Sequence, residues 1–210
     1  MVAIIDYGLG NIRSVAAAVA RVGFVPIVTA DPAELQRAEA LILPGVGAFG
    51  DGMANLRTRN LVEPLTDLIL HQQKPILGVC LGAQLFARSS EEFGHHEGLG
   101  WIAADVVRLA PPDGLRVPHV GWNDCIRTQQ SPLFDGIPTD ALFYYVHSFH
   151  IRCDDSTIVV GECEYGSRFT AAFQQKNIVA TQFHPEKSQQ HGLQFLKNFL
   201  LQMPARSYVA

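Results

Sequence analysis

Four short apolar segments in the first half of the chain, separated by longer amphipathic segments, restrict the fold more than any other feature. The apolar segments are Val2–Ile5, Val25–Thr29, Ala40–Leu43 and Pro75–Val79. Each has the length and composition of a buried strand. Parallel neighbouring strands need crossover connections, which are usually helices. The alternation therefore predicts a mostly parallel open sheet with flanking helices.

Helical signals lie between these strands. Asn11–Arg21 places Val15 and Val19 on one face, and Asp31–Pro32 has the form of an N-cap followed by proline at the first helical position. Leu61–His71 is a further predicted helix, and another is expected to run from Cys80 through Arg88. Ligands of such sheets bind beyond the carboxyl ends of the strands.

The second half of the chain has a different texture, with short alternating stretches and turn residues between them. We expect these to be antiparallel strands and hairpins added to the same sheet, followed by a helix over Gln189–Gln202. No linker is evident, so one domain over 1–210 is predicted. The expected strands are Asp105–Leu109, His119–Ile126, Phe143–Ile151, Ile158–Glu164, Thr170–Gln174 and Ile178–Gln182.

Composition argues against several classes of function. The 16 Lys and Arg are scattered and the net charge is -4, so no nucleic-acid partner is expected. No apolar run reaches the roughly 20 residues that span a bilayer, so no membrane partner is predicted either. The four cysteines form no CxxC pair, which indicates neither a zinc site nor a disulfide framework. A cytoplasmic protein with reduced thiols and without a bound metal is the expectation.

Gly78-Val79-Cys80-Leu81-Gly82 has the small-x-nucleophile-x-small form of a nucleophile elbow, with cysteine as the nucleophile. Such a turn strains the nucleophile's backbone and brings neighbouring chain close, which glycines on both sides permit. N–H groups at the start of the following helix would stabilise a thiolate. The alternative is a small buried core cysteine, but the flanking glycines favour catalysis.

His184 and Glu186 follow the predicted strand Ile178–Gln182. In extended chain, residues two apart point the same way, so the two side chains are expected on one face. A cysteine nucleophile needs a histidine as base, and a carboxylate orients the imidazole and stabilises its charged form. Each residue taken alone could be a solvated surface group beside a proline turn; the combination with Cys80 indicates a triad.

The order of Cys80 and a distant His-x-Glu resembles the class I (triad-type) glutamine amidotransferases. Further segments resemble, within that family, the glutaminase subunits of imidazole glycerol phosphate synthases, enzymes of histidine biosynthesis. Two departures are Ala83, where methionine is more common, and Phe149, where tyrosine is expected. The segments that carry the resemblance are Asp6–Asn11, Pro44–Phe49, Gly78–Gln84, Glu97–Gly100, Pro118–Asn123 and Gln182–Ser188.

The resemblance implies a mechanism without a cofactor. The Cys80 thiolate would attack the side-chain amide of glutamine, His184 would protonate the departing ammonia, and water would hydrolyse the thioester. Backbone N–H groups of Leu81 and of Val46 or Gly47 would hold the oxyanion, although Gly45-Val46-Gly47 could also be a simple tight turn. By resemblance, the residues around the amino-acid end of glutamine are Gln84, Glu92, His147, Ser148 and Phe149, with Glu92 paired to the ammonium.

The resemblance also implies a heterodimer with a (β/α)8-barrel cyclase that uses the ammonia to form imidazole glycerol phosphate and aminoimidazole carboxamide ribotide. Asn11, Trp122 and Lys187 would contact this partner; Trp122 could also be a core aromatic, and Lys187 a solvated turn charge or a salt-bridge partner. A backbone flip in Gly45–Gly47 could couple partner and glutaminase activity. Open alternatives are an equivalent subunit of another synthase, for example in amidino-sugar synthesis, a non-catalytic interaction subunit, and a cysteine peptidase.

Overall fold

The computed structural model describes residues 1–112 and 114–202, so residues 113 and 203–210 of the predicted domain lie outside it. The first part of the chain contains β1 (Val2–Ile5), α1 (Ile12–Arg21), β2 (Pro26–Thr29), α2 (Pro32–Arg37), β3 (Ala40–Leu43), α3 (Phe49–Thr58), α4 (Val62–Thr66), a π-helical turn η1 (Asp67–His71), β4 (Ile76–Val79) and α5 (Leu81–Gln84).

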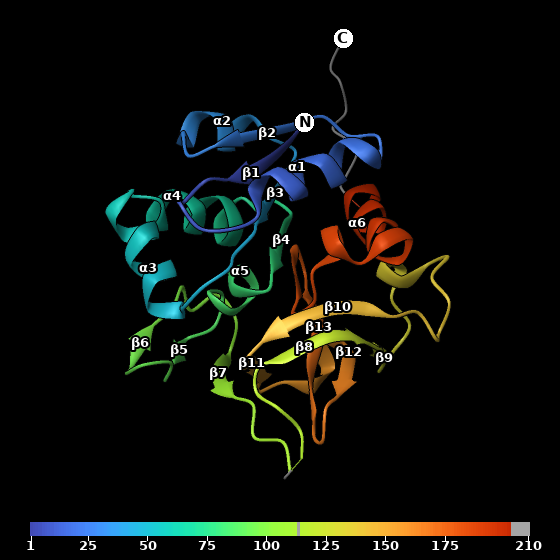
Figure 1. The fold of residues 1–210 in the computed structure, drawn as a ribbon. Helices are drawn as coiled ribbons and strands as arrows, with labels where there is room; N and C mark the ends of the chain where they lie inside the picture. The colour runs from blue at the N-terminus through green and yellow to red at the C-terminus, as the bar shows by residue number, and fades with distance from the viewer. Residues whose placement is uncertain (113, 203–210) are drawn as a thin grey trace.

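The second part contains mainly strands (Figure 1). They are β5 (Ser89–Ser90), β6 (His96–Glu97), β7 (Ala104–Arg108), β8 (His119–Asn123), β9 (Ile126–Arg127), β10 (Phe143–His147), β11 (Phe149–Cys153), β12 (Val159–Glu164), β13 (Arg168–Gln175) and β14 (Ile178–Thr181). Helix α6 (Gln189–Leu201) follows, and the 3-10 turns are η2 (Pro132–Phe134), η3 (Ser156–Ile158) and η4 (Pro185–Lys187).

Within the described residues, eight strands form the main sheet in the order β2-β1-β3-β4-β14-β13-β12-β9. β1 to β4 and β14 are parallel, and β13, β12 and β9 continue the sheet antiparallel. β14, which comes last among the strands, lies beside β4 with Thr181 opposite Val79. The carboxyl ends of β4 and β14 therefore meet at one edge.

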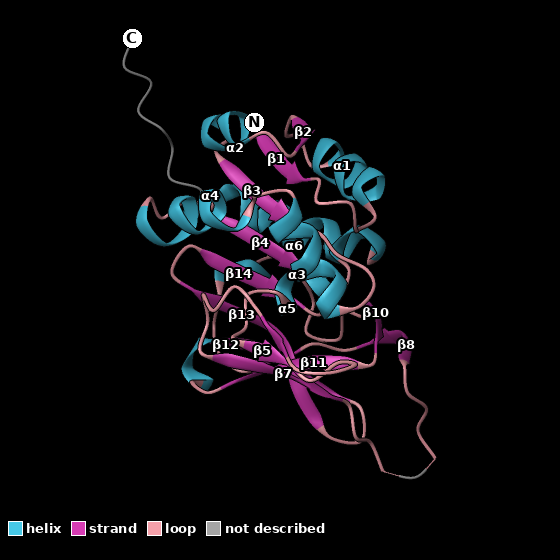
Figure 2. Ribbon diagram, turned by 90° about the vertical axis from the view of Figure 1, so that its left-hand side faces the viewer, coloured by secondary structure: helices cyan, strands magenta, loops and turns pink. Residues whose placement is uncertain are grey.

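Two apolar cores cover the two faces of this sheet. In β1, Val2 and Ile4 pack with α1 and α6, whereas Ala3 and Ile5 pack with α2, α3 and α4. This division follows from the period of two along a strand. Figure 2 shows α1 on one side of the parallel strands and α2 and α4 on the other. The α/β fold with a mostly parallel sheet and flanking helices, extended by antiparallel strands, is confirmed.

The antiparallel half is more divided than predicted. β10 pairs with β8, and β11, β7, β5 and β6 form a separate four-stranded sheet. The predicted strand Phe143–Ile151 is interrupted at Ser148, where the chain leaves β8 and begins to pair with β7. The carbonyl of Ser148 accepts a hydrogen bond from Leu109 N at this crossing. Local alternation does not reveal a change of pairing partner, because both halves keep the same period.

The helix after Cys80 is shorter than predicted and ends at Gln84 instead of Arg88. Carbonyls of residues 85–88 accept hydrogen bonds from the backbone N–H groups of residues 98–102 and so do not continue a helix.

Helix α3 was not predicted, because its Gly50 and Gly52 weaken the helical signal. A Cβ atom on Gly50 would lie 2.7 Å from the His96 ring, which accounts for the glycine. Within the described part of the chain, no helix combines the length and apolarity needed to cross a membrane.

Candidate active site

Cys80 lies at the sharp turn between β4 and α5 with φ 54° and ψ -110°. This positive φ is strained for a residue with a side chain. The flanking glycines are required by close packing: a Cβ on Gly78 would lie 2.5 Å from Phe86 Cε2, and one on Gly82 would lie 1.8 Å from the Leu43 carbonyl oxygen. The geometry is that of the nucleophile elbow predicted from the sequence.

The pairing of β14 with β4 brings His184 beside Cys80. Cys80 N donates to the Thr181 carbonyl at 2.8 Å, which continues the strand pairing up to the elbow. Beyond this point, His184 N donates to the Tyr144 carbonyl at 2.9 Å. The backbone on both sides of the site is thereby held by strands that are far apart in sequence.

His184 and Glu186 form a buried pair, with His184 Nδ1 and Glu186 Oε1 2.8 Å apart and both side chains 2% exposed. They meet through the 3-10 turn η4 rather than through the extended chain expected from the sequence. Ser188 Oγ closes this turn by donating to the His184 carbonyl at 2.6 Å. Glu186 thus holds the imidazole, and Ser188 holds the backbone of the turn that brings the two side chains together.

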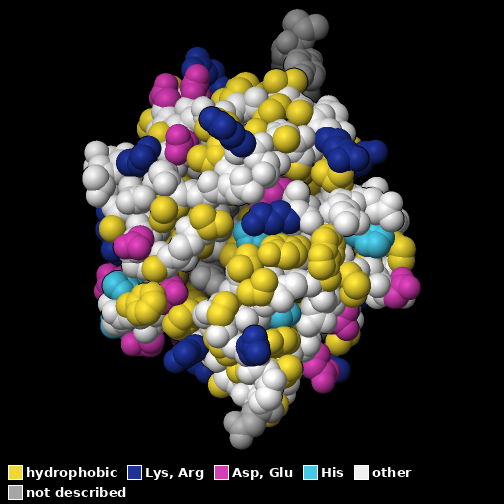
Figure 3. Space-filling model, in the orientation of Figure 1, with side chains coloured by type: hydrophobic (Ala, Val, Ile, Leu, Met, Phe, Trp, Pro, Cys, Tyr) yellow, Lys and Arg dark blue, Asp and Glu magenta, His cyan; other side chains and the backbone are white. Residues whose placement is uncertain are grey.

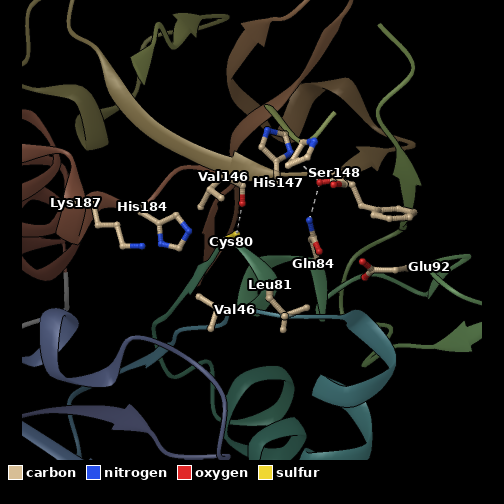
Figure 4. Close-up of a pocket in the computed structure, with 13 residues that line it drawn as sticks. Val46, Cys80, Leu81, Gln84, Glu92, Val146, His147, Ser148, His184 and Lys187 are labelled. Atoms are coloured by element: carbon tan, nitrogen blue, oxygen red, sulfur yellow. Dashed lines mark hydrogen bonds between the residues drawn. The ribbon is translucent and has the colours of Figure 1, made fainter. Parts of the chain in front are cut away.

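The other ring nitrogen, His184 Nε2, is buried without a hydrogen-bond partner among the described residues. Figure 4 shows the ring directed toward Cys80. Burial lowers the pKa of His184, but the adjacent Cys80 sulfur and the Glu186 carboxylate outweigh it and raise that pKa to about 10. The imidazole thus holds a proton at neutral pH and can give it to a leaving group.

The Cys80 sulfur has two polar neighbours besides the imidazole. Gln182 Nε2 donates to Sγ at 3.6 Å, and Sγ lies 3.9 Å from the Val146 carbonyl oxygen, which can accept from the thiol. Gln182 is itself 2% exposed. The sulfur is consequently enclosed by side chains from the segment between β14 and η4 and by the backbone of β10.

A cavity of about 420 Å³ opens above the sulfur (Figure 4). Glu92 lies at one side of it, Lys187 and His184 lie at the other, and Cys80 lies between them. A small amino acid fits a cavity of this size and polarity. The lining residues are Val46, Gly47, Cys80, Leu81, Gln84, Glu92, Pro118, Val146, His147, Ser148, Phe149, His184 and Lys187.

Comparison with known proteins agrees with this geometry. Residues 3–203 match the family described as glutamine amidotransferase class-I. The chain belongs to the class I glutamine amidotransferase family. It is 46% identical to imidazole glycerol phosphate synthase subunit HisH 1 of Campylobacter jejuni strain RM1221, covering 95% of this chain and 99% of that protein. It is 45% identical to imidazole glycerol phosphate synthase subunit HisH 2 of Vibrio vulnificus, with 95% and 93% covered.

The fold is also similar to that of solved structures. The structure titled PurLQS from Thermotoga maritima aligns with a TM-score of 0.74 at 20% identity, covering 95% of this chain and 97% of that one. This likeness supports the class I amidotransferase fold alone.

All five residues predicted to bind glutamine line the cavity, and the side chains of Gln84 and His147 both contact the Phe149 carbonyl. Gln84 Nε2 donates to the Phe149 carbonyl at 2.9 Å and to Gln182 Oε1 at 3.1 Å. His147 Nδ1 lies 2.9 Å from the same carbonyl, and its Nε2 lies 3.1 Å from His119 Nδ1. Burial lowers the pKa of His147 to about 3, so this ring is neutral. Gln84 and His147 therefore brace the cavity wall at Phe149.

Glu92 has a fixed carboxylate that faces the cavity. Its Oε2 accepts from Phe49 N at 2.8 Å, at the first residue of helix α3. The side chain lines the cavity, and a carboxylate can accept at both of its oxygens. The amidotransferase therefore has a carboxylate, held by a helix N-terminus, that can receive an ammonium group.

The glycine-rich loop after β3 lies against the elbow. A Cβ on Gly45 would be 2.6 Å from Gly82 N and 2.6 Å from Tyr7 Oη, so this end of the loop is tightly enclosed. Gly47 has φ +107° and its added Cβ would meet nothing within 4 Å. Val46, between them, is 39% exposed. The loop is thus fixed at one end and unconstrained by side-chain packing at the other.

Two of the three predicted interface residues lie together. Trp122 on β8 is 46% exposed and packs edge-on to Tyr144, with ring centroids 6.0 Å apart. Lys187 Nζ lies 5.5 Å from the centre of the same Tyr144 ring. Figure 3 shows a band of hydrophobic side chains across the centre of the molecule, below a basic side chain. Asn11, the third of these residues, is the N-cap residue of α1 and makes no side-chain cap bond.

The sequence did not reveal several residues that complete the site. Tyr144 contacts both Trp122 and Lys187, and Gln182 contacts the Cys80 sulfur. Tyr144 could have been identified as an outward position in the alternation of Phe143–His147. No local signal marks Gln182, because its contact with Cys80 depends on the pairing of β14 with β4.

Proposed function

We propose that this chain is the glutaminase subunit of imidazole glycerol phosphate synthase. It hydrolyses glutamine to glutamate and ammonia and passes the ammonia to a (β/α)8-barrel cyclase subunit, which forms imidazole glycerol phosphate and aminoimidazole carboxamide ribotide in histidine biosynthesis. The observation that carries the glutaminase step is the buried His184–Glu186 pair beside the Cys80 sulfur, within a cavity of about 420 Å³. Relatives named HisH at 45–46% identity support the choice of synthase.

Catalysis begins with the Cys80 thiolate and the protonated His184. The sulfur attacks the amide carbon of glutamine, a C–S bond forms, and the oxygen becomes an oxyanion held by N–H groups of Leu81 and of Val46 or Gly47. The C–N bond then breaks as His184 Nε2 gives its proton to the leaving nitrogen, which departs as ammonia.

The thioester is hydrolysed in the second half of the reaction. His184, now neutral, takes a proton from water, and the resulting hydroxide attacks the thioester carbon. The C–S bond breaks, glutamate leaves, and the thiolate–imidazolium pair is restored. Glu186 fixes the ring through Nδ1 in both halves, and its carboxylate stabilises each charged form of the imidazole.

The cavity supports glutamine as the substrate. Glu92 can pair with the α-ammonium group, while Ser148 and Phe149 line the wall beside it. The side-chain amide would then extend toward Cys80, since Figure 4 shows Glu92 to one side of Cys80.

We also propose a cytoplasmic location, because the four cysteines are unpaired, as is usual in reducing compartments.

The test is a glutaminase assay on the chain mixed with candidate barrel synthases, with and without the ribonucleotide substrate. We expect co-purification with the histidine-pathway cyclase, glutamate release that increases with partner and nucleotide, and no release by Cys80→Ala. Glutamate release by Cys80→Ala in the complex would refute the triad. Association with a different synthase only would refute the pathway.

A second candidate is an equivalent glutaminase subunit that serves another synthase, for example one that makes amidino sugars. Relatives carry the numbers 1 and 2 in their names, and Ala83 and Phe149 depart from the residues expected in the subunit. The chemistry at Cys80 would be the same. The partner assay above distinguishes the two candidates.

A further inference from the structure

A buried glutamine side chain contacts the Cys80 sulfur and has no role in the mechanism described above. Gln182 follows β14, is 2% exposed, and its Nε2 donates to the Cys80 sulfur at 3.6 Å. Its backbone N–H is already used, donating to the Ala171 carbonyl at 2.8 Å. The side-chain amide is thus a separate polar group enclosed beside the sulfur, and such groups are retained only where they are hydrogen-bonded.

The orientation of this amide is determined by a chain of donors and acceptors. The Phe149 carbonyl can only accept, so the group of Gln84 that faces it at 2.9 Å must be the NH2. The same NH2 donates to Gln182 Oε1 at 3.1 Å. Gln182 must therefore present its NH2 to the sulfur. Turning the amide over would oppose two donors at Gln84 and place an oxygen against Cys80.

The two polar neighbours of the sulfur favour different protonation states. The Val146 carbonyl, at 3.9 Å, can accept a hydrogen bond from the thiol but offers nothing to a thiolate. The Gln182 NH2 can donate to either form, and a donor to a charged atom is stronger than one to a neutral atom. Gln182 therefore stabilises the thiolate relative to the thiol, and relative to the neutral sulfur of a thioester.

We propose that Gln182 is a positioning residue that holds the Cys80 sulfur as a thiolate, and that Gln84 and the Phe149 carbonyl orient it for this task. The sulfur is thereby connected through two amides to the wall of the cavity in which the substrate lies. The catalytic consequence rests on the proposed glutaminase function, but the effect on the thiol does not.

The test is the rate at which iodoacetamide alkylates Cys80 in the isolated full chain, followed by mass spectrometry of the Cys80 peptide. Burial raises the pKa of Cys153 to about 11 and of Cys163 to about 12, and raises that of Cys125 further. These three thiols stay protonated between pH 6 and pH 9, so they react slowly in the same experiment.

Gln182→Met keeps the length of the side chain and removes its donor. We expect alkylation about tenfold slower than in the wild-type chain at pH 7, the effect of losing one hydrogen bond to a charged group, with the two rates converging as pH rises. Gln182→Glu, which replaces the donor by a carboxylate, should be slower still. The matched control is Gln174→Met, the same substitution on β13, where the amide bonds Gln202 at 3.3 Å; its rate should equal that of the wild type.

Thermal unfolding of each variant separates a local from a global effect. A folded Gln182→Met that alkylates at the wild-type rate from pH 6 to pH 9 would overturn the proposal. If both Gln182 variants fail to fold, Gln84→Met decides, because it releases Gln182 Oε1 and should also slow alkylation; an unchanged rate would overturn the proposal. A wild-type chain with no glutaminase activity in any complex refutes the proposed function alone and leaves the alkylation result standing.

Discussion

Gly82→Ala is the substitution whose consequence can be worked out most directly. The added Cβ would lie 1.8 Å from the Leu43 carbonyl oxygen and 2.7 Å from its carbon. Cβ contacts below 3.0 Å essentially do not occur, so the end of β3 and the start of α5 must separate by at least about 1.2 Å. Both contacts are backbone atoms, so no side-chain rotation relieves them.

This displacement acts directly on the site. The end of β3 carries the loop with Val46 and Gly47, and the start of α5 carries Leu81, so the two predicted halves of the oxyanion site move apart. A misplacement of about 1 Å can lower a catalysed rate about 100-fold. Overpacking costs about 1–3 kcal/mol, which for a chain of this size lowers the unfolding temperature by about 2–12 °C.

Glutamate release by the complex and thermal unfolding of the isolated chain measure the two effects. Gly52→Ala, within α3, is the matched control, because its Cβ meets side-chain methyl groups that can move, those of Leu85 at 3.1 and 3.2 Å and Leu81 Cδ2 at 3.5 Å. Its activity should stay within about threefold of the wild type, and alanine favours a helix. If Gly82→Ala equalled Gly52→Ala in both assays, the inferred backbone clash at Leu43 would be refuted.

Three further substitutions, one of them with a matched control, test other parts of the site. Despite burial, adjacent negative groups raise the pKa of His184 from 6.5 to about 10, so the resulting stability is complete below pH 6.5 and is lost as pH rises through about 10. Glu186→Gln should therefore lower the unfolding temperature most at pH 6 and least near pH 10; a constant difference would contradict this. Trp122→Ala should weaken partner binding about 30-fold, measured by calorimetry, if this residue anchors the interface. Gly47→Ala, at φ +107°, and Gly23→Ala, at φ +94°, both have open space and should cost similar stability; only Gly47→Ala should reduce glutamate release.

The sequence was most informative where local pattern determines structure. The strands that end at Leu43 and Val79 were identified because short apolar runs bounded by turn residues are too short for most buried helices. The sharp turn at Cys80 was predicted because glycines on both sides of a residue are required where that turn packs closely against neighbouring chain. These features depend only on residues close together in the chain.

Pairing between distant segments could not be predicted in the same way. The break at Ser148 and the contact of Gln182 with Cys80 both depend on which strand lies beside which. The sequence placed His184 and Glu186 on one face of an extended chain, whereas the two side chains meet on a 3-10 turn. Helix α3 was not predicted because two of its residues are glycines, which lower helical propensity. They pack closely against His96 and Leu85.

The position of β14 between β4 and β13 also determines when, during synthesis of the chain, the Cys80 thiol can become reactive. A ribosome that has made the first 100 residues has completed β4 and the Cys80 turn, but has not yet made His184 or its carboxylate. Chains are made at about 5–20 residues per second, so Cys80 exists for roughly 5–20 seconds before its predicted base is made. We therefore expect electrophiles to react slowly with the Cys80 thiol of a nascent chain. The thiol should become reactive only after β14 has paired with β4, when nearly the whole chain has been made.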